Sequence, residues 1–269
     1  MPEGHVVHSQ ARRLSRTFGR EAVVVDSPQG RFVDGARIVD GHVITKVEAH
    51  GKHLFIGFDN NRWIHVHLGL YGKWRFGEAE APPAVGEVRL RLRTDVAWAE
   101  LRGPAVCELL DNFGRKDAIH RIGPDPIRVG TDSEPAWDKV TVSSLPIGQL
   151  LMNQSVLSGV GNIYRAEVLF RHGISPFRLG RDVTREEFDA IWADLVALMR
   201  DGASRGRIDT VRREHMPRAM GRAPRRDRHG GEVYVYRRGG MQCLICHTPI
   251  SVEQMQGRSL YWCPQCQAT

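Results

Sequence analysis

The sequence lacks the features that would place it in a membrane or in an oxidising compartment. No run of about 18 apolar residues occurs among its 269 residues, so no segment is predicted to span a bilayer. Its start has no basic region followed by an apolar one, so we expect no secretory signal. Of only five cysteines, four fall in the last 27 residues, and Cys107 stands alone. This distribution argues against a disulfide framework and favours the reducing cytoplasm.

Acidic residues are few relative to basic ones. The chain carries 38 Lys and Arg against 31 Asp and Glu, which gives a net charge of +7. The excess is concentrated in residues 201–240, which contain eleven Arg and five acids. Such a stretch is compatible with a polyanionic partner such as nucleic acid, or with a merely solvated surface. The length and the 41% hydrophobic content allow two modest domains.

The first part of the chain is predicted to be a β-sandwich or barrel-like domain with a leading helix. Apolar residues in 5–18 recur at helical spacing, and Gly19 follows as a stop signal. From about 22 to 110, short β-branched or alternating segments are separated by Gly, Asn and Pro. Residues 87–93 alternate with period two, and the Asn pair at 60–61 predicts a hairpin turn.

The remainder is predicted to be a linker, a helical domain and a small terminal module. The segment 123–146 is rich in Pro, Asp and Ser and is interpreted as an interdomain linker. Thr184 and Glu187 form the pattern of a capping box at the start of a long helix. We therefore divide the chain into an N-terminal domain (1–122), a linker (123–146), a helical domain with a basic loop (147–232) and a C-terminal cysteine module (233–269).

Two Cys-x2-Cys pairs, sixteen residues apart, are the strongest local signal: Cys243, Cys246, Cys263 and Cys266. Four thiolates on two adjacent turns predict a closed tetrahedral site, which Zn²⁺ prefers, and the metal would stabilise a module too small to hold a core of its own. The segment between the pairs is predicted to be a β-hairpin with Gly257 at its tip. Arg258, beside the tip, could reach a phosphate or could be a solvated charge.

The segment GQLLMNQSVLSGVGNIYRAEVLFRHG predicts a helix, a glycine-rich double turn and a second helix. Asn162 stands where the second helix begins and is a good N-cap residue. Gly159 and Gly161 would leave backbone N–H groups open, and such a helix N-terminus suits a phosphate group. The alternative interpretation is an ordinary αα-hairpin with a capping asparagine.

These features occur in one chain in a fixed order: Pro-Glu-Gly at residues 2–4, GVGNIYRAE at 159–167, and a four-cysteine hairpin with Gly-Arg before its second pair. The combination resembles the Fpg/Nei family of bifunctional DNA glycosylases, over the whole chain. The resemblance implies an α+β multidomain fold with an N-terminal helix plus β-sandwich, a helix–two-turn–helix domain and a C-terminal zinc-finger β-hairpin. It also implies one structural Zn²⁺ and glycosylase with AP lyase activity.

The resemblance assigns catalytic roles to three residues. After removal of Met1, the secondary amine of Pro2 would attack C1′ of a damaged nucleotide and form a Schiff base, and β/δ-elimination would then cleave the strand. An α-amino group has a pKa of about 8, so an unprotonated fraction exists at neutral pH. Glu3 would protonate the sugar ring oxygen. Lys52 would contact DNA phosphate and assist catalysis.

The resemblance also assigns DNA contacts to His67, Leu70, Tyr71, Asn162 and Arg258. Leu70 and Tyr71 would fill the gap left by a flipped-out base, whereas the other three would contact phosphate. The sequence departs from the family pattern at Gly69, where a glutamine can stand, and at Val6, where an acid is common. His5, His8, His50, His53, His65 and His67 are interpreted as ordinary strand and helix positions, because no acid partners for a metal site are evident.

The Pro-Glu-Gly start and the Leu-Tyr pair favour the Nei branch, whose usual substrates are oxidised pyrimidines such as thymine glycol and 5-hydroxyuracil. The alternatives are an oxidised-purine glycosylase, acting on 8-oxoguanine or formamidopyrimidine, and a non-catalytic zinc-ribbon DNA-binding protein. The basic stretch 205–228 stands where purine-specific members carry a lesion-capping loop, and is otherwise interpreted as a disordered basic loop. We expect a monomer that acts on damaged double- or single-stranded DNA, associated with the nucleoid, with no small-molecule cofactor and no membrane contact.

Overall fold

The computed structural model describes residues 2–227 and 231–268, and the chain divides into two compact units, Met1–Arg121 (unit 1) and Ile122–Thr269 (unit 2). Each unit is described by itself. Within the described ranges, no helix combines the length and the apolar character needed to cross a bilayer.

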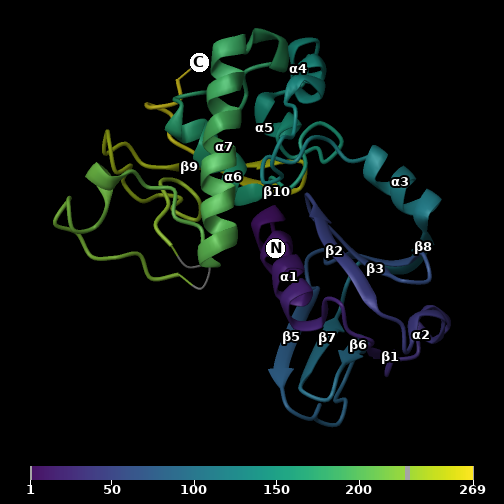
Figure 1. The fold of residues 1–269 in the computed structure, drawn as a ribbon. Coiled ribbons are helices and arrows are strands. Elements are labelled where there is room, and N and C mark those ends of the chain that lie inside the picture. Colours follow the sequence, from purple (N-terminus) through teal and green to yellow (C-terminus); the bar gives the residue numbers. More distant parts are fainter. Residues whose placement is uncertain (1, 228–230, 269) are drawn as a thin grey trace. The chain divides into compact units, whose positions relative to one another are not determined.

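Unit 1 is a sandwich of two antiparallel four-stranded sheets, ordered β1-β6-β7-β5 and β2-β3-β4-β8 (Figure 1). Its elements are α1 (Gly4–Phe18), β1 (Val24–Asp26), α2 (Val33–Val39), β2 (Ile44–His50), β3 (His53–Phe58), β4 (Arg62–His67), β5 (Lys73–Glu78), β6 (Val88–Arg93), β7 (Ala97–Arg102), β8 (Val106–Asp111) and α3 (Asn112–His120). The predicted β-sandwich with a leading helix is confirmed.

The apolar stripe of α1 explains how the first helix joins this sandwich. Val7, Ala11, Leu14 and Phe18 are all buried in the core of unit 1, as their helical spacing predicts. The helix packs against β2 and β3. The helix ends at Gly19, whose N–H donates to Ser15 O at 3.0 Å. The first residues of the chain are thereby attached to the sheet that contains the candidate catalytic lysine.

The strand predictions of unit 1 are also confirmed in their details. On β6, Val88, Leu90 and Leu92 are buried as the period-two alternation predicts. The turn between β3 and β4 falls at the Asn pair. Asn61 adopts a left-handed φ of 59°, a conformation that asparagine tolerates better than most residues.

Unit 2 is helical, with a terminal two-stranded hairpin. Its elements are α4 (Glu134–Thr141), α5 (Ile147–Leu150), α6 (Asn162–Arg171), η1 (Gly180–Asp182), α7 (Arg185–Arg205), η2 (Arg213–His215), β9 (Ser251–Met255) and β10 (Arg258–Trp262). The predicted capping box begins α7: Thr184 Oγ1 accepts from Glu187 N at 3.2 Å, and Glu187 Oε2 accepts from Thr184 N at 2.9 Å. Gly206, with φ of 73°, ends the helix.

Two expectations for unit 2 need correction. The segment 123–146 is more than a linker, because it contains α4, whose Ala136 and Val140 are buried in the core of unit 2. The polar residues around this helix masked its short apolar stripe.

The basic stretch 205–228 is ordered over its described part, up to residue 227. Ion pairs join Arg222 to Glu232 at 2.7 Å and Arg225 to Asp227 at 2.6 Å. Its arginines therefore hold the loop by bonding to local acids, and the interpretation as a disordered loop does not apply to these residues. Arg228 lies outside the described residues.

Candidate functional site

The two residues proposed for the chemistry stand directly before α1. Glu3 is the N-cap residue of the helix, in an extended conformation, and its carbonyl accepts from Val6 N at 3.0 Å. The Glu3 side chain is only 1% exposed, and Pro2 is half-buried. Burying a carboxylate is costly unless it is well engaged. A frayed terminal tail would leave this carboxylate in solvent, so its burial is unusual for a residue this near the first residue.

Lys52 lies in the tight turn between β2 and β3, beside Gly51, whose φ is 56°. Although it lies in a turn, its side chain is only 8% exposed. The charge of Lys52 acts on His67, at the end of β4. Burial lowers the pKa of His67, and the positive charge of Lys52 lowers that pKa further. The structure thus brings Lys52 and His67 into one electrostatic neighbourhood.

The loop after β4 presents two apolar side chains to solvent. Leu70 is 56% and Tyr71 is 84% exposed, as expected for side chains that act only when a partner is present. Gly69, one of the departures from the family pattern, has a φ of 65°, and a Cβ there would approach Ala105 Cβ to 2.7 Å. This close approach explains why glycine occupies the position.

The double turn between α5 and α6 is organised by one glutamine side chain. Helix α5 has only four residues, so the first helix of the motif is shorter than expected. Gln154 Nε2 donates to Met152 O and Val160 O, both at 3.0 Å, and its Oε1 accepts from Gly159 N at 3.0 Å. The Gly159 N–H is therefore engaged within the turn, which corrects the expectation that it is open to an anion.

Asn162 is the first residue of α6 rather than its N-cap, which is Gly161. The amide of Asn162 instead links the helix to the hairpin: Nδ2 donates to Ser259 O at 2.8 Å, and Oδ1 accepts from the guanidinium of Arg165. Arg165 is fully buried, so the amide orientation is held from inside the core. Arg258, half-buried, directly precedes Ser259 on β10. The hydrogen bond from Asn162 to Ser259 thus brings Asn162 next to Arg258, the other predicted phosphate contact of unit 2.

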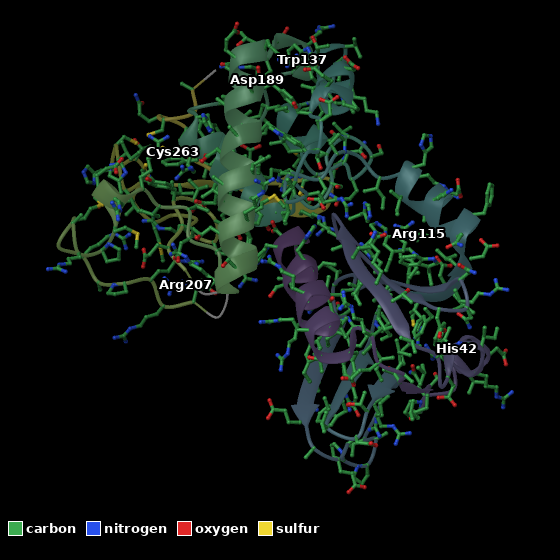
Figure 2. The ribbon with its side chains drawn as sticks, viewed as in Figure 1. His42, Arg115, Trp137, Asp189, Arg207 and Cys263 are labelled. Carbon is green, nitrogen blue, oxygen red and sulfur yellow. The ribbon has the colours of Figure 1, made fainter. Side chains whose placement is uncertain are left out.

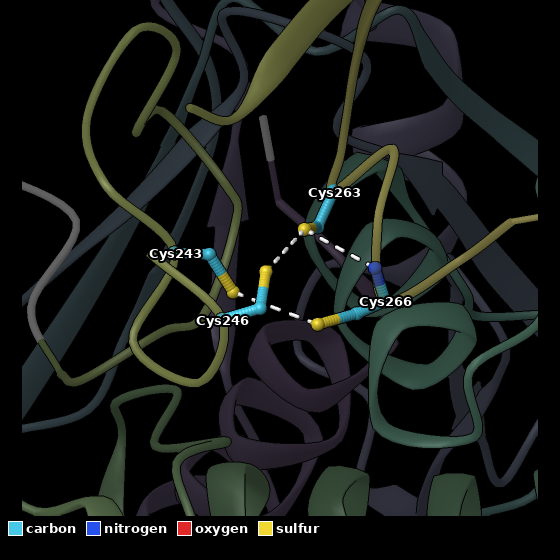
Figure 3. Close-up of side chains that lie close together, drawn as sticks. All are labelled: Cys243, Cys246, Cys263 and Cys266. Atoms are coloured by element: carbon cyan, nitrogen blue, oxygen red, sulfur yellow. Dashed lines mark hydrogen bonds between the residues drawn. The ribbon is translucent and has the colours of Figure 1, made fainter. Parts of the chain in front are cut away.

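The four cysteines converge on one point (Figure 3). Their Sγ atoms all lie within 4.8 Å of one another, with 3.4 Å between Cys246 and Cys263 and 3.9 Å between Cys243 and Cys266. A tetrahedral site with Zn–S bonds of about 2.3 Å requires S–S separations of about 3.8 Å. The donor set therefore fits one metal ion, and it is the group among the described residues that can hold one. The hairpin β9–β10, with Gly257 at its turn, is confirmed.

The sequence interpretation missed the partners of the strand histidines. His65 Nδ1 lies 2.8 Å from Glu108 Oε1, and His53 Nδ1 lies 2.9 Å from His65 Nε2. Glu108 is 43 residues from His65 along the chain, so only the pairing of β4 with β8 reveals it. The His-x-His pattern at 65 and 67 was the available signal.

Family models match both units. The formamidopyrimidine-DNA glycosylase N-terminal domain matches residues 1–106, and the formamidopyrimidine-DNA glycosylase H2TH domain matches residues 122–213. The chain is 45% identical over 271 residues to "Endonuclease 8 1" of Mycobacterium tuberculosis, covering 99% of this chain and 100% of the relative. It is 30% identical to "DNA-(apurinic or apyrimidinic site) lyase Nei2" of Mycolicibacterium smegmatis, covering 99% of both.

Solved structures share the fold. A complex of Lactococcus lactis Fpg with DNA that contains an abasic site has a TM-score of 0.79 at 20% identity, covering 99% of this chain and 100% of that one. A complex of the same enzyme with DNA that contains an oxidized pyrimidine has a TM-score of 0.80, covering both chains fully.

The fold, the cysteine cluster and the relatives together define a DNA repair enzyme of the glycosylase and AP lyase class. The chain belongs to the formamidopyrimidine-DNA glycosylase family, which includes the Fpg and Nei enzymes.

Proposed function

We propose that the protein excises oxidised bases, principally pyrimidines such as thymine glycol and 5-hydroxyuracil, through a Schiff base on Pro2, and then cleaves the strand by β/δ-elimination. The observation that carries this proposal is the juxtaposition of Pro2 with the buried carboxylate of Glu3 at the start of α1, in a chain of this family. The likeness to relatives named endonuclease 8 supports the Nei branch, for which the resemblance in sequence implies oxidised pyrimidines.

The proposed chemistry needs a free amine, a proton donor and a held phosphate. With Met1 removed, the Pro2 nitrogen attacks C1′, and the base leaves with the electron pair of the glycosidic bond. Once the Pro2 nitrogen has lost its proton, Glu3 protonates the ring oxygen, and the C1′–O4′ bond breaks to give the iminium. The resulting iminium cation acidifies the C2′ hydrogen. Loss of that proton expels the 3′ phosphate, and a second elimination expels the 5′ phosphate. Lys52 and His67 would hold a phosphate beside the reacting sugar.

The other contacts follow from the two units taken separately. Leu70 and Tyr71 would occupy the space of the extruded nucleotide, since both are exposed and apolar. Asn162 and Arg258 would bind phosphate from unit 2. The four cysteines would hold one Zn²⁺ that keeps the Arg258 hairpin in shape. We further propose that the enzyme is a cytoplasmic, nucleoid-associated monomer that acts on damaged double- or single-stranded DNA.

A covalent trap tests the catalytic assignment. Borohydride added to the protein with DNA that carries an abasic site should reduce the iminium and leave a stable protein–DNA adduct. Pro2→Gly, which leaves a primary amine, should lower the adduct yield by at least about tenfold, whereas Glu3→Gln should abolish base excision. Glu78→Gln, at an exposed carboxylate of β5, is the matched control. Absence of an adduct with folded protein whose Met1 has been removed would refute the Pro2 mechanism and favour a non-catalytic binder.

A panel of lesions tests the substrate. Duplexes with thymine glycol, 5-hydroxyuracil, 8-oxoguanine and formamidopyrimidine, and the matching single strands, should be cleaved fastest at the two pyrimidines. Faster excision of 8-oxoguanine than of either pyrimidine would assign the enzyme to oxidised purines instead.

A further inference from the structure

One face of the sheet β2-β3-β4-β8 carries a band of titratable side chains that the proposed chemistry does not explain. Residues two apart share a face, and the register places Phe55 beside Glu48 and His65, and His53 beside His50 and His67. The titratable side chains of this face are Lys46, Glu48 and His50 on β2, His53 on β3, His65 and His67 on β4, and Glu108 on β8. The alternate residues, such as Leu54 and Val66, are buried in the apolar core.

Three of these side chains form a continuous hydrogen-bonded network, defined here as Glu108–His65–His53. The distances are 2.8 Å from Glu108 Oε1 to His65 Nδ1 and 2.9 Å from His65 Nε2 to His53 Nδ1. The His65 ring is stacked on Phe55, with 4.7 Å between centroids and an interplanar angle of 8°. The His53 ring is nearly parallel to it, at 17°, and its centroid is 5.1 Å away, the spacing expected for two imidazole rings joined edge to edge by this hydrogen bond. The Phe55 ring and the two hydrogen bonds hold His65 in one orientation.

The remaining acid of this face is engaged elsewhere. Glu48 pairs with Lys46 at 2.8 Å and with Arg115 of α3, and His50 lies 3.5 Å from the same carboxylate. Arg115, labelled in Figure 2, also lies over the ring of Trp63, 4.2 Å from its centroid. Glu108 is therefore the carboxylate that sets the state of His65.

The network has a direction. An ionised carboxylate only accepts, so His65 must carry its proton on Nδ1 to bond with Glu108. In its neutral state, His65 then has a lone pair on Nε2, and His53 must donate to it from Nδ1. The neutral His53 ring is left with its own lone pair on Nε2. Both rings are thereby held as the Nδ1–H tautomer.

The free end of this network lies in the neighbourhood of the proposed phosphate site. The His53 ring is 4.8 Å from the His67 ring, centroid to centroid. Burial lowers the pKa of His53 to about 3, with smaller contributions from the charges of His67, His65, His50 and Lys52. His53 is therefore neutral near pH 7, and Lys52 is close enough to influence it.

We propose that the Glu108–His65–His53 network is a positioning device for Lys52 and His67: it keeps an acceptor lone pair, rather than an N–H donor, at Nε2 of His53, whose ring lies 4.8 Å from that of His67. This inference rests on the proposed role of Lys52 and His67 in holding DNA phosphate. A lone pair attracts the Lys52 ammonium, whereas an N–H would repel it. Glu108, Phe55 and the two rings touch no reacting atom, so their role is to position.

Loss of the Glu108 carboxylate reverses the network. Without an acceptor at Nδ1, His65 is free to carry its proton on Nε2 and to donate to His53 Nδ1. His53 must then carry its own proton on Nε2, which replaces the lone pair there with an N–H donor. Glu108→Ala makes this change, whereas Glu108→Gln retains an amide oxygen that can accept from His65 and so preserves the direction.

The first measurement is the tautomer of each ring. Long-range ¹H–¹⁵N NMR of imidazole-labelled protein at pH 8 should show His53 and His65 as Nδ1–H tautomers in the wild type and in E108Q, and as Nε2–H tautomers in E108A. Half of the Glu108 side chain is exposed, so both variants should fold. Nε2–H tautomers on either ring of the wild type would overturn the proposal.

The second measurement is affinity for a duplex with a non-cleavable abasic-site analogue, by fluorescence anisotropy. E108A should weaken binding by roughly threefold to tenfold, the range for one weakened charged hydrogen bond, and E108Q and the control E78Q should bind like the wild type. In a K52Q background the effect of E108A should disappear, because the coupling acts through Lys52.

The two proposals fail in different ways. Suppose that the tautomers of the wild type and of E108A are as expected and that K52Q binds DNA weakly. If E108A then binds DNA like the wild type, the positioning role is overturned and the assignment of Lys52 is left intact. Wild-type affinity of K52Q would refute the phosphate role of Lys52, and the positioning proposal with it. Tighter binding of E108A would contradict the sign of the proposed effect.

Discussion

Unit 1 and unit 2 each contain a glutamate that accepts hydrogen bonds from residues distant in the sequence, but the partners differ. In unit 2, the Glu167 carboxylate accepts from the backbone N–H groups of residues 234–236 at 2.7–2.8 Å. In unit 1, Glu108, His65 and His53 bond to one another across three strands. Side chains that saturate the backbone of a remote segment hold a fold together, whereas side chains that bond to one another on a sheet face can change state without unfolding it. Unit 2 is therefore built for rigidity, and unit 1 carries tunable chemistry.

Of the changes considered, removal of the metal should lower the stability of the protein most, and it should destabilise unit 2 alone. A structural Zn²⁺ contributes on the order of 10 kcal/mol to small cysteine modules, and the cores around Cys243 and Cys263 are small. We expect a strong chelator to move the indole NMR signal of Trp262 from its native position to that of an unfolded chain and to weaken DNA binding, while Trp74 of unit 1 keeps its native signal. Metal analysis should return one zinc per chain. Loss of the native signals of both Trp262 and Trp74 would show that the metal stabilises unit 1 as well.

Glu167→Ala should cost unit 2 about 3–5 kcal/mol, because it leaves the three N–H groups of residues 234–236 buried without their acceptor. Thr210, whose hydroxyl donates to the same carboxylate at 2.5 Å, would lose that bond and keep only its longer contact with Glu232 O at 3.3 Å. Urea unfolding followed by tryptophan fluorescence measures the loss. Glu108→Ala, at the half-exposed carboxylate of unit 1, is the matched comparison and should cost under about 1 kcal/mol. Equal losses of unfolding free energy in the two variants would contradict the proposed difference between the units.

Acidification should destabilise unit 1 before unit 2. Burial lowers the pKa of His5 to about 4 and that of His53 to about 3, whereas both titrate near 6.5 when unfolded. The unfolded state therefore binds more protons below pH 6.5, and stability falls with the pH. In unit 2, burial alone would raise the pKa of Asp194, but His172 and Arg171 outweigh burial and lower it to about 2. The stability that the ionised Asp194 contributes to unit 2 is therefore lost only as the pH falls from about 4 to about 2.

Between pH 7 and pH 5, unit 1 should lose about 1–2 kcal/mol for each of these two histidines. Urea titrations at the two pH values, read from the indole signals of Trp74 in unit 1 and Trp192 in unit 2, separate the two responses. His53→Asn should reduce the acid sensitivity of unit 1. An unchanged midpoint for Trp74 at pH 5 would show that the buried histidines do not govern its stability.

Asn162→Ala should have the smallest effect on stability, about 1 kcal/mol, since it removes one hydrogen bond to Ser259 O. Its effect on DNA affinity should be larger, several-fold, because the hairpin that carries Arg258 loses its tie to α6. Asn162→Asp keeps the acceptor for Arg165 but loses the donor, so it should weaken affinity at least as much. Melting temperature and anisotropy, measured together, distinguish the two effects. Affinity equal to that of the wild type in both variants would remove Asn162 from the DNA contacts.

Local patterns predicted much of the fold because their physical cause is local. The stripe of α1, the alternation of β6, the Asn60–Asn61 turn and the capping box of α7 each depend on residues close in sequence, and each is confirmed. The four cysteines were found for the same reason, since two residues between ligands suffice to form a metal knuckle. Helix α4 was missed because its stability comes from burial of Ala136 and Val140 rather than from its composition.

The sequence by itself determined which chemical groups this protein has: a proline and an acid at its start, a lysine, two apolar residues in a loop and four thiolates at its end. Only the tertiary structure decided how several of them are used. Gln154 engages the Gly159 N–H, Arg165 orients Asn162, and the pairing of β4 with β8 brings Glu108 to His65. The physical reason is that these partners are side chains brought into register by strand pairing and helix packing, which no short-range pattern records.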